Sequence, residues 1–212
     1  MPRIALTKGR LLEPALAWLE GLGFSRPDMG SRSLSLPIGR GWEAIFLKGA
    51  DVPVFVQNGA ADLGVVGADI LEEDGPDVYD LMALDFGRCR LSLAAVAGWE
   101  PRPGDGQLRV ATKYPRLAER FLSAQGFLVR VIKVSSSAEL APLMGLSDVI
   151  VDIVDSGRTL KENGLQEVQV LDPVQAHLVA NRRAYRFLSE RWWEADLLGS
   201  VTGVEEAGWL LG

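Results

Sequence analysis

The stretch VIVDIVDSGRTL, residues 149–160, decides the fold class that this sequence predicts. Its first six residues are apolar apart from one acid and are mostly β-branched, which indicates a buried strand over 149–154. Small residues follow at 155–157, and the chain then opens a helix that includes residues 160–163. A strand that leads into a helix through a short turn is the repeating unit of α/β folds with parallel sheets.

Short apolar runs and helical periodicity alternate on both sides of this stretch. Residues 4–6 form a short apolar run, and leucines and alanines between 12 and 22 recur at helical spacing. A helix is expected to begin at Pro115, because proline suits the first helical position. Further strands are expected at 65–66, 91–96, 109–112 and 127–133. The alternation favours an α/β architecture with largely parallel sheets.

The order of these elements predicts two α/β lobes with a cleft between them. The segment WEPRPGDG, residues 99–106, is the clearest loop and is expected to be a surface excursion inside the second lobe. A helical face over 184–195 has no strand after it in the sequence, so we expect it to pack back on the first lobe. The first lobe is therefore expected to comprise residues 1–88 and 178–212, and the second residues 89–177. Clefts between lobes commonly bind ligands.

Composition and charge exclude several classes of protein. With 212 residues, 48% of them hydrophobic and 24% charged, the chain has the composition of a soluble globular protein. A net charge of −6 argues against non-specific binding to nucleic acid, which needs a basic face. The sequence has no run of 18 apolar residues and no signal-like start, so we expect a cytoplasmic protein without a membrane span. One cysteine and one histidine, Cys89 and His177, exclude an internal disulfide and a histidine cluster for metal.

The turn after the strand over 149–154 is the strongest candidate for a phosphate site. Free main-chain N–H groups and the start of a helix converge at such a junction, and both attract an anion. Gly157 lets the backbone approach a ligand closely, and the hydroxyls of Ser156 and Thr159 add donors. Asp155 offers an acceptor for ribose hydroxyls. The alternative is that Ser156 or Thr159 only caps the helix and nothing binds.

Two other turns after strands carry candidate anion sites. Lys8 and Arg10 flank a glycine directly after the strand over residues 4–6. Cations at a helix N-terminus are unfavourable because they oppose the helix dipole, and this favours a functional role for Lys8 and Arg10. The alternative is that they are solvated residues at the start of a helix, and both interpretations stay open. Gly67, which opens a helix after a buried strand, is a further candidate, but its pattern is weak on its own.

Lys113 and Glu139 complete the candidates drawn from the residues alone. Lys113 lies where the strand over 109–112 meets a helix start, a position at which a cation can face a phosphate. Glu139 follows a run of three serines. Its alternative role is structural, in a capping box with Ser136 at the start of a helix.

Segments in the same order resemble the ATP phosphoribosyltransferase family. The sequence ALTKGR, residues 5–10, is similar to the family's N-terminal strand and turn. Residues 51–71, DVPVFVQNGAADLGVVGADIL, are similar to its central helix–strand segment. Residues 109–121 and 135–165 resemble its most diagnostic stretch. The length resembles the short form of the family, which lacks the C-terminal regulatory domain of the long form.

The resemblance implies a fold, a reaction and a partner. The fold is two α/β lobes of the type II periplasmic-binding-protein kind, with the active site in the cleft between them. The reaction opens histidine biosynthesis: phosphoribosyl passes from 5-phosphoribosyl 1-diphosphate to N1 of ATP, giving phosphoribosyl-ATP and pyrophosphate. Mg²⁺ is carried on the pyrophosphate, and no protein metal site is expected. The partner is a regulatory subunit similar to histidyl-tRNA synthetase, in a hetero-octamer that histidine inhibits.

The resemblance also assigns roles to residues of this chain. The loop for the phosphoribosyl phosphate falls on Asp155, Ser156, Gly157, Arg158 and Thr159. Ribose or adenine contacts fall on Glu139 and Asp152. Phosphate contacts fall on Lys8, Arg10, Arg32 and Lys113, with Gly67 kept in the substrate-binding set. The expected catalytic residues are Lys8, Arg32, Lys48 and Asp155.

The chain departs from the family's pattern at three places. The family usually has proline at the position of Thr7, a change that a turn tolerates. Its arginine-lysine-leucine segment is Arg32-Ser33-Leu34 here, and its later arginine-proline is Lys48-Gly49. Lys48 supplies charge to the leaving group but not the bidentate fork of an arginine.

The chemistry of this reaction fits the candidate residues. Transfer at an anomeric carbon passes through an oxocarbenium-like state, in which negative charge grows on pyrophosphate and positive charge spreads over the ribose. Cations of the protein suit the negative charge on pyrophosphate, and the carboxylates of Asp155 and Glu139 suit the positive charge on the ribose. The reaction needs no covalent nucleophile. Two alternatives stay open. One is a noncatalytic protein of the same fold that binds small anions or nucleotides, and the other is a phosphoribosyltransferase for another base.

Overall fold

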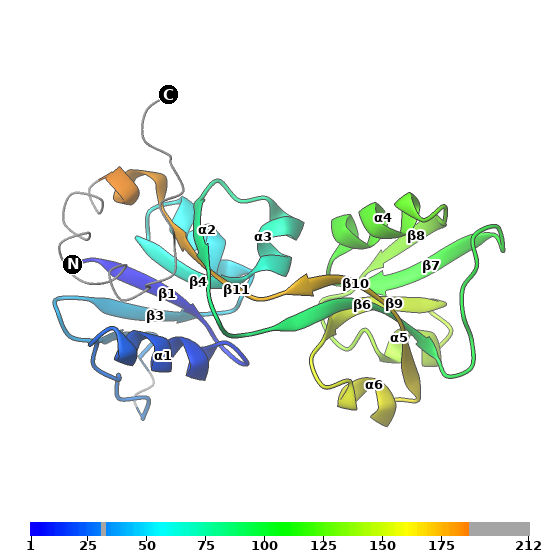
Figure 1. The fold of residues 1–212 in the computed structure, drawn as a ribbon, viewed down its shortest axis with the longest axis horizontal. Coiled ribbons are helices and arrows are strands. Elements are labelled where there is room, and N and C mark those ends of the chain that lie inside the picture. The colour runs from blue at the N-terminus through cyan, green and yellow to red at the C-terminus, as the bar shows by residue number, and fades with distance from the viewer. Residues whose placement is uncertain (31–32, 187–212) are drawn as a thin grey trace. The chain divides into compact units, whose positions relative to one another are not determined.

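The structure, a computed structural model, describes residues 1–30 and 33–186, and its chain divides into two compact units (Figure 1). Unit 1 comprises Met1–Val66, Pro76–Met82 and the chain from His177. Unit 2 comprises Gly67–Gly75 and Ala83–Ala176. Each unit contains one sheet with helices, which confirms the predicted two-lobed α/β class.

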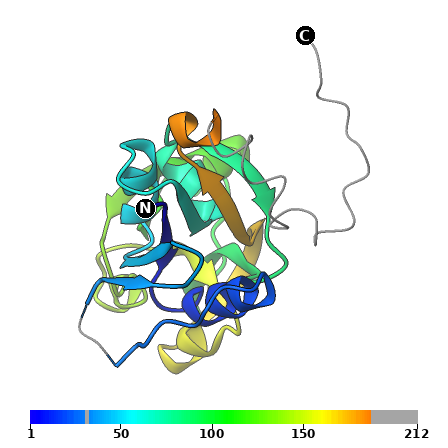
Figure 2. The ribbon, with the colours of Figure 1, turned by 90° about the vertical axis from the view of Figure 1, so that its left-hand side faces the viewer.

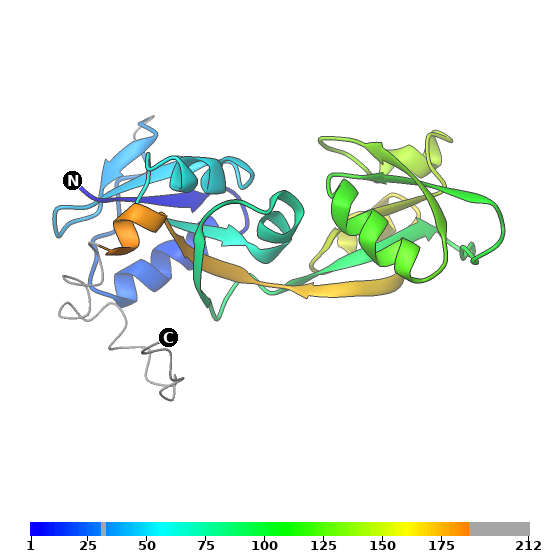
Figure 3. The ribbon, with the colours of Figure 1, turned by 90° about the horizontal axis from the view of Figure 1, so that it is seen from above.

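Unit 1 is built on a six-stranded mixed sheet with helices on both faces. The strand order is β2-β3-β1-β4-β11-β5, in which β1 pairs in parallel with β3 and β4, and β2 pairs antiparallel to β3. Figures 2 and 3 show α1 and α2 on opposite sides of β1. The elements are β1 (Arg3–Thr7), α1 (Leu12–Gly21), β2 (Ser35–Pro37), β3 (Glu43–Leu47), α2 (Asp51–Gln57), β4 (Leu63–Gly67), β5 (Tyr79–Ala83) and β11 (Ala176–Ala180).

Gly64 in β4 lets helix α2 pack directly onto the sheet. A Cβ atom at this position would lie 2.8 Å from side-chain atoms of Val52 and of Val56, closer than real Cβ contacts. Both valines are completely buried and lie about one turn apart on α2, so the helix presents one apolar face to the strand. The buried strand expected at 65–66 is therefore β4.

Unit 2 is a five-stranded sheet with a separate apolar core on each face. The strand order is β10-β6-β9-β7-β8, with β7 parallel to β8 and β9, and β6 antiparallel to β9 and β10. Leu117 and Leu122 belong to one core, and Ala141 and Leu160 to the other. The elements are α3 (Ala68–Asp74), β6 (Cys89–Val96), β7 (Gln107–Thr112), α4 (Pro115–Ala124), β8 (Leu128–Lys133), α5 (Leu140–Leu143), β9 (Val149–Val154), α6 (Arg158–Glu162) and β10 (Leu165–Val174).

The local elements around the quoted stretch agree with the sequence, whereas the strand directions do not. The strand expected over 149–154 is β9, and the helix expected from Pro115 is α4. Residues 99–106 form the expected loop, between β6 and β7. The sheets are mixed rather than largely parallel, because β2, β6 and β10 run against their neighbours. Side-chain periodicity is the same for both directions, so sequence pattern does not distinguish them.

Helix α3 belongs to unit 2, which corrects the expected lobe boundary at residue 88. The Glu73 carboxylate accepts the main-chain N–H groups of Arg116 and Leu117 at 3.0 and 2.9 Å. These groups lie in the first turn of α4, where helical geometry leaves N–H groups without acceptors. The Tyr114 hydroxyl also donates to Asp69 at 2.7 Å. Hydrogen bonds between residues more than 40 positions apart therefore tie α3 to unit 2.

Two expected features fall wholly or partly outside the described residues. Arg32 is one of them. The helical face expected over 184–195 is the other: a helix is described at 182–186, and the remainder of that face lies outside. None of the described helices has the length and apolar character that crossing a membrane requires.

We expect Glu73→Ala to lower the free energy of unfolding by about 1–2 kcal/mol, because it removes the cap of α4 and leaves the buried N–H of Leu117 without its acceptor. Glu72→Ala is the matched control: Glu72 is the neighbouring acid, but it only pairs with Arg120 on the surface. Such exposed pairs contribute little, about 0–1 kcal/mol. Urea unfolding of both variants measures the difference. Equal losses would show that Glu73 does not cap α4.

Candidate functional site

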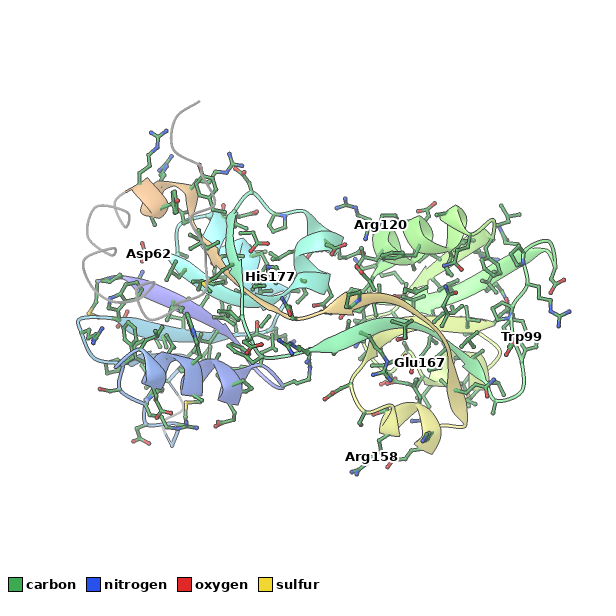
Figure 4. All side chains as sticks on the ribbon, in the orientation of Figure 1. Asp62, Trp99, Arg120, Arg158, Glu167 and His177 are labelled. Carbon is green, nitrogen blue, oxygen red and sulfur yellow. The ribbon has the colours of Figure 1, made fainter. Side chains whose placement is uncertain are left out.

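The loop between β9 and α6 is a tight turn with exposed polar groups. Gly157, the N-cap residue of α6, has a φ of 74°, a left-handed conformation that side chains rarely adopt. No side chain caps the N-terminus of α6. The Arg158 N–H donates to the Ser156 hydroxyl oxygen over a long distance of 3.4 Å. Arg158 and Thr159 are exposed on the first turn of α6, where Figure 4 labels Arg158. The loop thus offers main-chain N–H groups, hydroxyls and one guanidinium to a ligand.

A buried carboxylate and a lysine lie at the carboxyl ends of β9 and β7. Thr112 pairs with Val151 in the parallel register of these strands, which places Lys113 next to Asp152. The Lys113 Nζ lies 3.4 Å from each carboxylate oxygen of Asp152. Burial raises the pKa of Asp152, and the charge of Lys113 works against that rise. The pair places a cation beside a largely desolvated acceptor.

Glu139 adds a second acid to this pair. It is the N-cap residue of α5 and makes no side-chain cap hydrogen bond, so the capping box with Ser136 is not formed. The negative charge of Glu139 adds to the rise in the pKa of Asp152, after burial as the main cause. The two carboxylates can accept hydrogen bonds from sugar hydroxyls, and the lysine can attract a phosphate.

Arg90 of β6 links the loop to the edge strand β10. Its Nε and Nη2 lie 2.6 and 2.7 Å from the two carboxylate oxygens of Glu167, which Figure 4 labels on β10. Its Nη1 donates to the main-chain oxygen of Asp155 at 2.8 Å. The hydrogen bonds from Arg90 lower the pKa of Glu167. Sequence reasoning missed this pair, because its members lie 77 positions apart and neither belongs to a motif.

The cations of unit 1 gather at one end of its sheet. Thr7 pairs with Leu47 in the parallel register of β1 and β3, so Lys8 and Lys48 directly follow neighbouring strands. The main-chain N–H of Lys8 donates to the Leu47 oxygen at 2.8 Å, which continues the pairing to this point. Both lysines are exposed, as is Arg10 in the following turn. Positive charge concentrated at one sheet edge can attract a polyanion.

The turn at Gly67 is filled by a carboxylate of the protein itself. A Cβ atom at Gly67 would overlap Oδ1 of Asp69. The Tyr114 hydroxyl donates to the other oxygen, Oδ2, and burial together with this carboxylate raises the pKa of Tyr114. Tyr114 therefore stays a neutral donor. A negative charge over Gly67 repels a phosphate, so this turn is a poor anion site.

Within each unit, the structure brings several predicted residues together. In unit 2, Lys113 and Asp152 are in contact at the end of the sheet from which the loop at 155–159 emerges. In unit 1, Lys8 and Lys48 lie side by side at the strand ends. The described residues contain no group of three or more His, Cys, Asp and Glu side chains that could hold a metal ion. His177 instead lies 2.9 Å from Asp80.

Comparison with known proteins gives a consistent family. The HisG family model, described as ATP phosphoribosyltransferase, matches residues 48–196, more than half of the chain. An ATP phosphoribosyltransferase of Symbiobacterium thermophilum is 44% identical over 195 residues, which cover 89% of this chain and 88% of that protein.

Solved structures agree in fold. The ATP phosphoribosyl transferase (HisG:HisZ) complex from Thermotoga maritima matches with a TM-score of 0.77 and 33% identity, covering 92% of this chain and 94% of that chain. The periplasmic aliphatic sulphonate binding protein SsuA from Escherichia coli has a TM-score of 0.55 at 14% identity, covering 94% of this chain and 70% of that chain. At so low an identity, the second likeness concerns the fold alone.

Proposed function

The chain belongs to the ATP phosphoribosyltransferase family, and we propose that its loop at residues 155–159 binds the phosphate of the donor's phosphoribosyl group. As a member it is a pentosyltransferase, which transfers phosphoribosyl from 5-phosphoribosyl 1-diphosphate to ATP in the first step of histidine biosynthesis. The match over residues 48–196 carries this conclusion, because it includes the loop, the strand before it and the helix after it.

The conformation of the loop supports its assignment to a phosphate. A left-handed residue in a turn rotates successive N–H groups toward one side, an arrangement that binds anions. Gly157 supplies that conformation, and it also keeps the backbone free of a side chain where the ligand approaches. The hydroxyls of Ser156 and Thr159 and the guanidinium of Arg158 lie on the same exposed turn. Their donors add to those of the main chain.

The carboxylates of unit 2 suit the ribose and its developing positive charge. Asp155 is exposed directly after β9, and we assign its carboxylate to the ribose hydroxyls of the donor. Asp152 and Glu139 provide further acceptors for ribose or adenine, and Lys113 provides a cation for a phosphate. Fixed negative groups of this kind stabilise an oxocarbenium-like transition state more than the ground state.

The cations of unit 1 suit the leaving pyrophosphate. Lys8 and Lys48 share one sheet edge, Arg10 lies in the next turn, and we assign Arg32 the same role from the family resemblance. Negative charge that grows on the departing oxygen is stabilised by these cations. Mg²⁺ enters with the donor's pyrophosphate as part of the substrate and neutralises part of its charge. N1 of ATP attacks the anomeric carbon, so no protein nucleophile is required.

A regulatory partner is the second part of the proposal. The solved relative from Thermotoga maritima is a HisG:HisZ complex, and this chain covers 94% of its matched chain. We therefore propose that this chain assembles with a regulatory subunit similar to histidyl-tRNA synthetase, in a hetero-octamer of the cytoplasm that histidine inhibits. We expect histidine to inhibit the assembled enzyme only through that regulatory subunit.

A turnover assay tests the proposed function. We expect absorbance to rise as phosphoribosyl-ATP forms when ATP, the donor and Mg²⁺ are all present. We expect histidine to inhibit only when the regulatory subunit is added. Ligand binding without any product would favour a noncatalytic binding protein, and product from a free base in place of ATP would indicate another phosphoribosyltransferase. Inhibition of this chain alone by histidine would contradict the short-form assignment.

A further inference from the structure

Arg90 lies outside every motif of the sequence, yet its side chain contacts the loop at residues 155–159. Its Nε and Nη2 are both held by the Glu167 carboxylate, which fixes the plane of the guanidinium. The third nitrogen, Nη1, donates to the main-chain oxygen of Asp155. The hydroxyl of Ser92, a completely buried residue, donates to Glu167 at 2.6 Å and so fixes the carboxylate in turn.

The contact with Asp155 orients a peptide group rather than a side chain. The carbonyl of Asp155 and the N–H of Ser156 belong to one planar trans peptide, in which they point in opposite directions. A donor that holds the carbonyl from one side therefore aims the N–H of Ser156 to the other side. A hydrogen bond to the carbonyl also polarises the peptide, which strengthens the Ser156 N–H as a donor.

We propose that Arg90 is a positioning residue for donor binding: by holding the Asp155 carbonyl, it aims the main-chain N–H of Ser156 at the phosphate of the phosphoribosyl group. This inference rests on the proposed function, because it requires the loop to bind that phosphate. Arg90 acts through the peptide and does not touch the ligand. Lysine does not replace it, since an ammonium cannot grip Glu167 through two parallel bonds and also reach Asp155.

Arg109 of β7 repeats the same construction at the opposite end of β9. Its Nε and Nη2 bond the Asp148 carboxylate at 3.2 and 2.6 Å, and its Nη1 donates to the main-chain oxygen of Gly145 at 2.9 Å. The side chains of Arg90 and Arg109 are similarly exposed, at 32% and 39%. Arg109→Lys therefore removes the same kinds of bonds without touching the loop. It is the matched control for the structural cost of Arg90→Lys.

Calorimetry on the full chain separates positioning from structural support. The probes are ribose 5-phosphate, which carries only the phosphate assigned to the loop, and pyrophosphate, which represents the leaving group. We expect Arg90→Lys to weaken ribose 5-phosphate binding about tenfold, the order of one well-oriented hydrogen bond. Pyrophosphate binding should stay unchanged. In turnover, the KM for the donor should rise while kcat and the KM for ATP stay near their wild-type values.

Arg109→Lys should lower the melting temperature about as much as Arg90→Lys and leave binding of both probes unchanged. Wild-type affinity of Arg90→Lys for ribose 5-phosphate, with the same loss of stability as Arg109→Lys, would overturn the proposal and leave Arg90 a structural residue. Glu167→Gln keeps the shape of the carboxylate and weakens its grip, so it decides the matter where Arg90→Lys does not fold. Reduced ribose 5-phosphate affinity of that variant supports the proposal, and wild-type affinity contradicts it.

A third variant separates this inference from the proposed function on which it rests. Gly157→Val changes the loop itself. If Gly157→Val and Arg90→Lys both keep wild-type affinity for ribose 5-phosphate, the loop does not bind that phosphate, and both proposals fall. If Gly157→Val loses affinity while Arg90→Lys keeps it, the loop assignment stands and only the role of Arg90 is refuted.

Discussion

Replacing Gly157 by valine is expected to abolish binding of 5-phosphoribosyl 1-diphosphate, with affinity reduced at least about 100-fold. The reason is backbone strain, since Gly157 has a φ of 74° and a β-branched residue is strongly disfavoured there. Holding it in that conformation costs about 1–3 kcal/mol, so the loop changes shape instead. Packing is not the cause: a Cβ atom at Gly157 would lie 3.9 Å from Val154, an ordinary contact. Calorimetry with the donor measures the loss.

Two substitutions serve as controls for this variant. Gly157→Asn should retain part of the donor affinity, because asparagine tolerates the left-handed conformation better than other side chains. Gly164→Val imposes the same kind of strain outside the loop, at a φ of 67° with open space around its Cβ atom. It should lower stability and leave donor affinity intact. Unchanged donor affinity of Gly157→Val would refute the assignment of the loop.

The second large effect is expected at Asp155, where replacement by alanine should reduce kcat by about 10²–10³-fold. The carboxylate is assigned to the ribose, whose positive charge grows in the transition state, so its loss affects turnover more than binding. The main-chain oxygen that Arg90 holds is still present in Asp155→Ala, and the conformation of the loop should persist. Steady-state kinetics with donor and ATP varied separately would show the fall in kcat.

The charge and the hydrogen bonds of Asp155 can be separated. Asp155→Asn keeps an acceptor oxygen and removes the charge, so its kcat should lie between those of wild type and Asp155→Ala. Asp105→Ala, in the exposed loop between β6 and β7, is a neutral control that removes the same charge from unit 2. A kcat for Asp155→Ala equal to that of the Asp105 control would remove Asp155 from the mechanism.

The quoted stretch shows what local sequence can predict. β9 has the expected bounds, because a β-branched apolar run ended by an acid and small residues determines both its interior and its end. The sequence does not predict β10, because LQEVQVLDPV has four polar residues and a proline among its ten. Such a strand is tolerated at the edge of a sheet, where one side makes no ladder bonds, and β10 is an edge strand. The place of β10 at the edge becomes apparent only from the strand order of the sheet.

The lobe boundary predicted at residue 88 is also wrong because it depends on contacts between distant residues. Residues 67–75 come directly after a strand segment of unit 1 in the sequence, which predicts that they belong to the same lobe. Their assignment to unit 2 depends on Asp69 and Glu73, whose partners lie on and before α4. Acidic residues on a short helix are usually solvated, so nothing in the local pattern distinguishes a distant cap from an exposed charge.

The sequence proposes the candidate site residues one by one, but it does not predict their arrangement in space. Lys113 is a candidate from its place after a strand and Asp152 from the family resemblance, but their contact depends on the register of β7 against β9. The link from Arg90 to Glu167 crosses an antiparallel pairing with bulges, which sequence spacing does not reveal. The sequence can therefore propose motif residues near a turn. The residues that hold the turn in place are identified only once the fold is known.

A crystal structure of the chain with 5-phosphoribosyl 1-diphosphate tests the central claim most directly. It should show the phosphate of the phosphoribosyl group within hydrogen-bond distance of the main-chain N–H groups at residues 156–159, with the Asp155 carboxylate on the ribose hydroxyls. A fully occupied donor whose phosphate lies elsewhere, with this turn bare, would contradict the account.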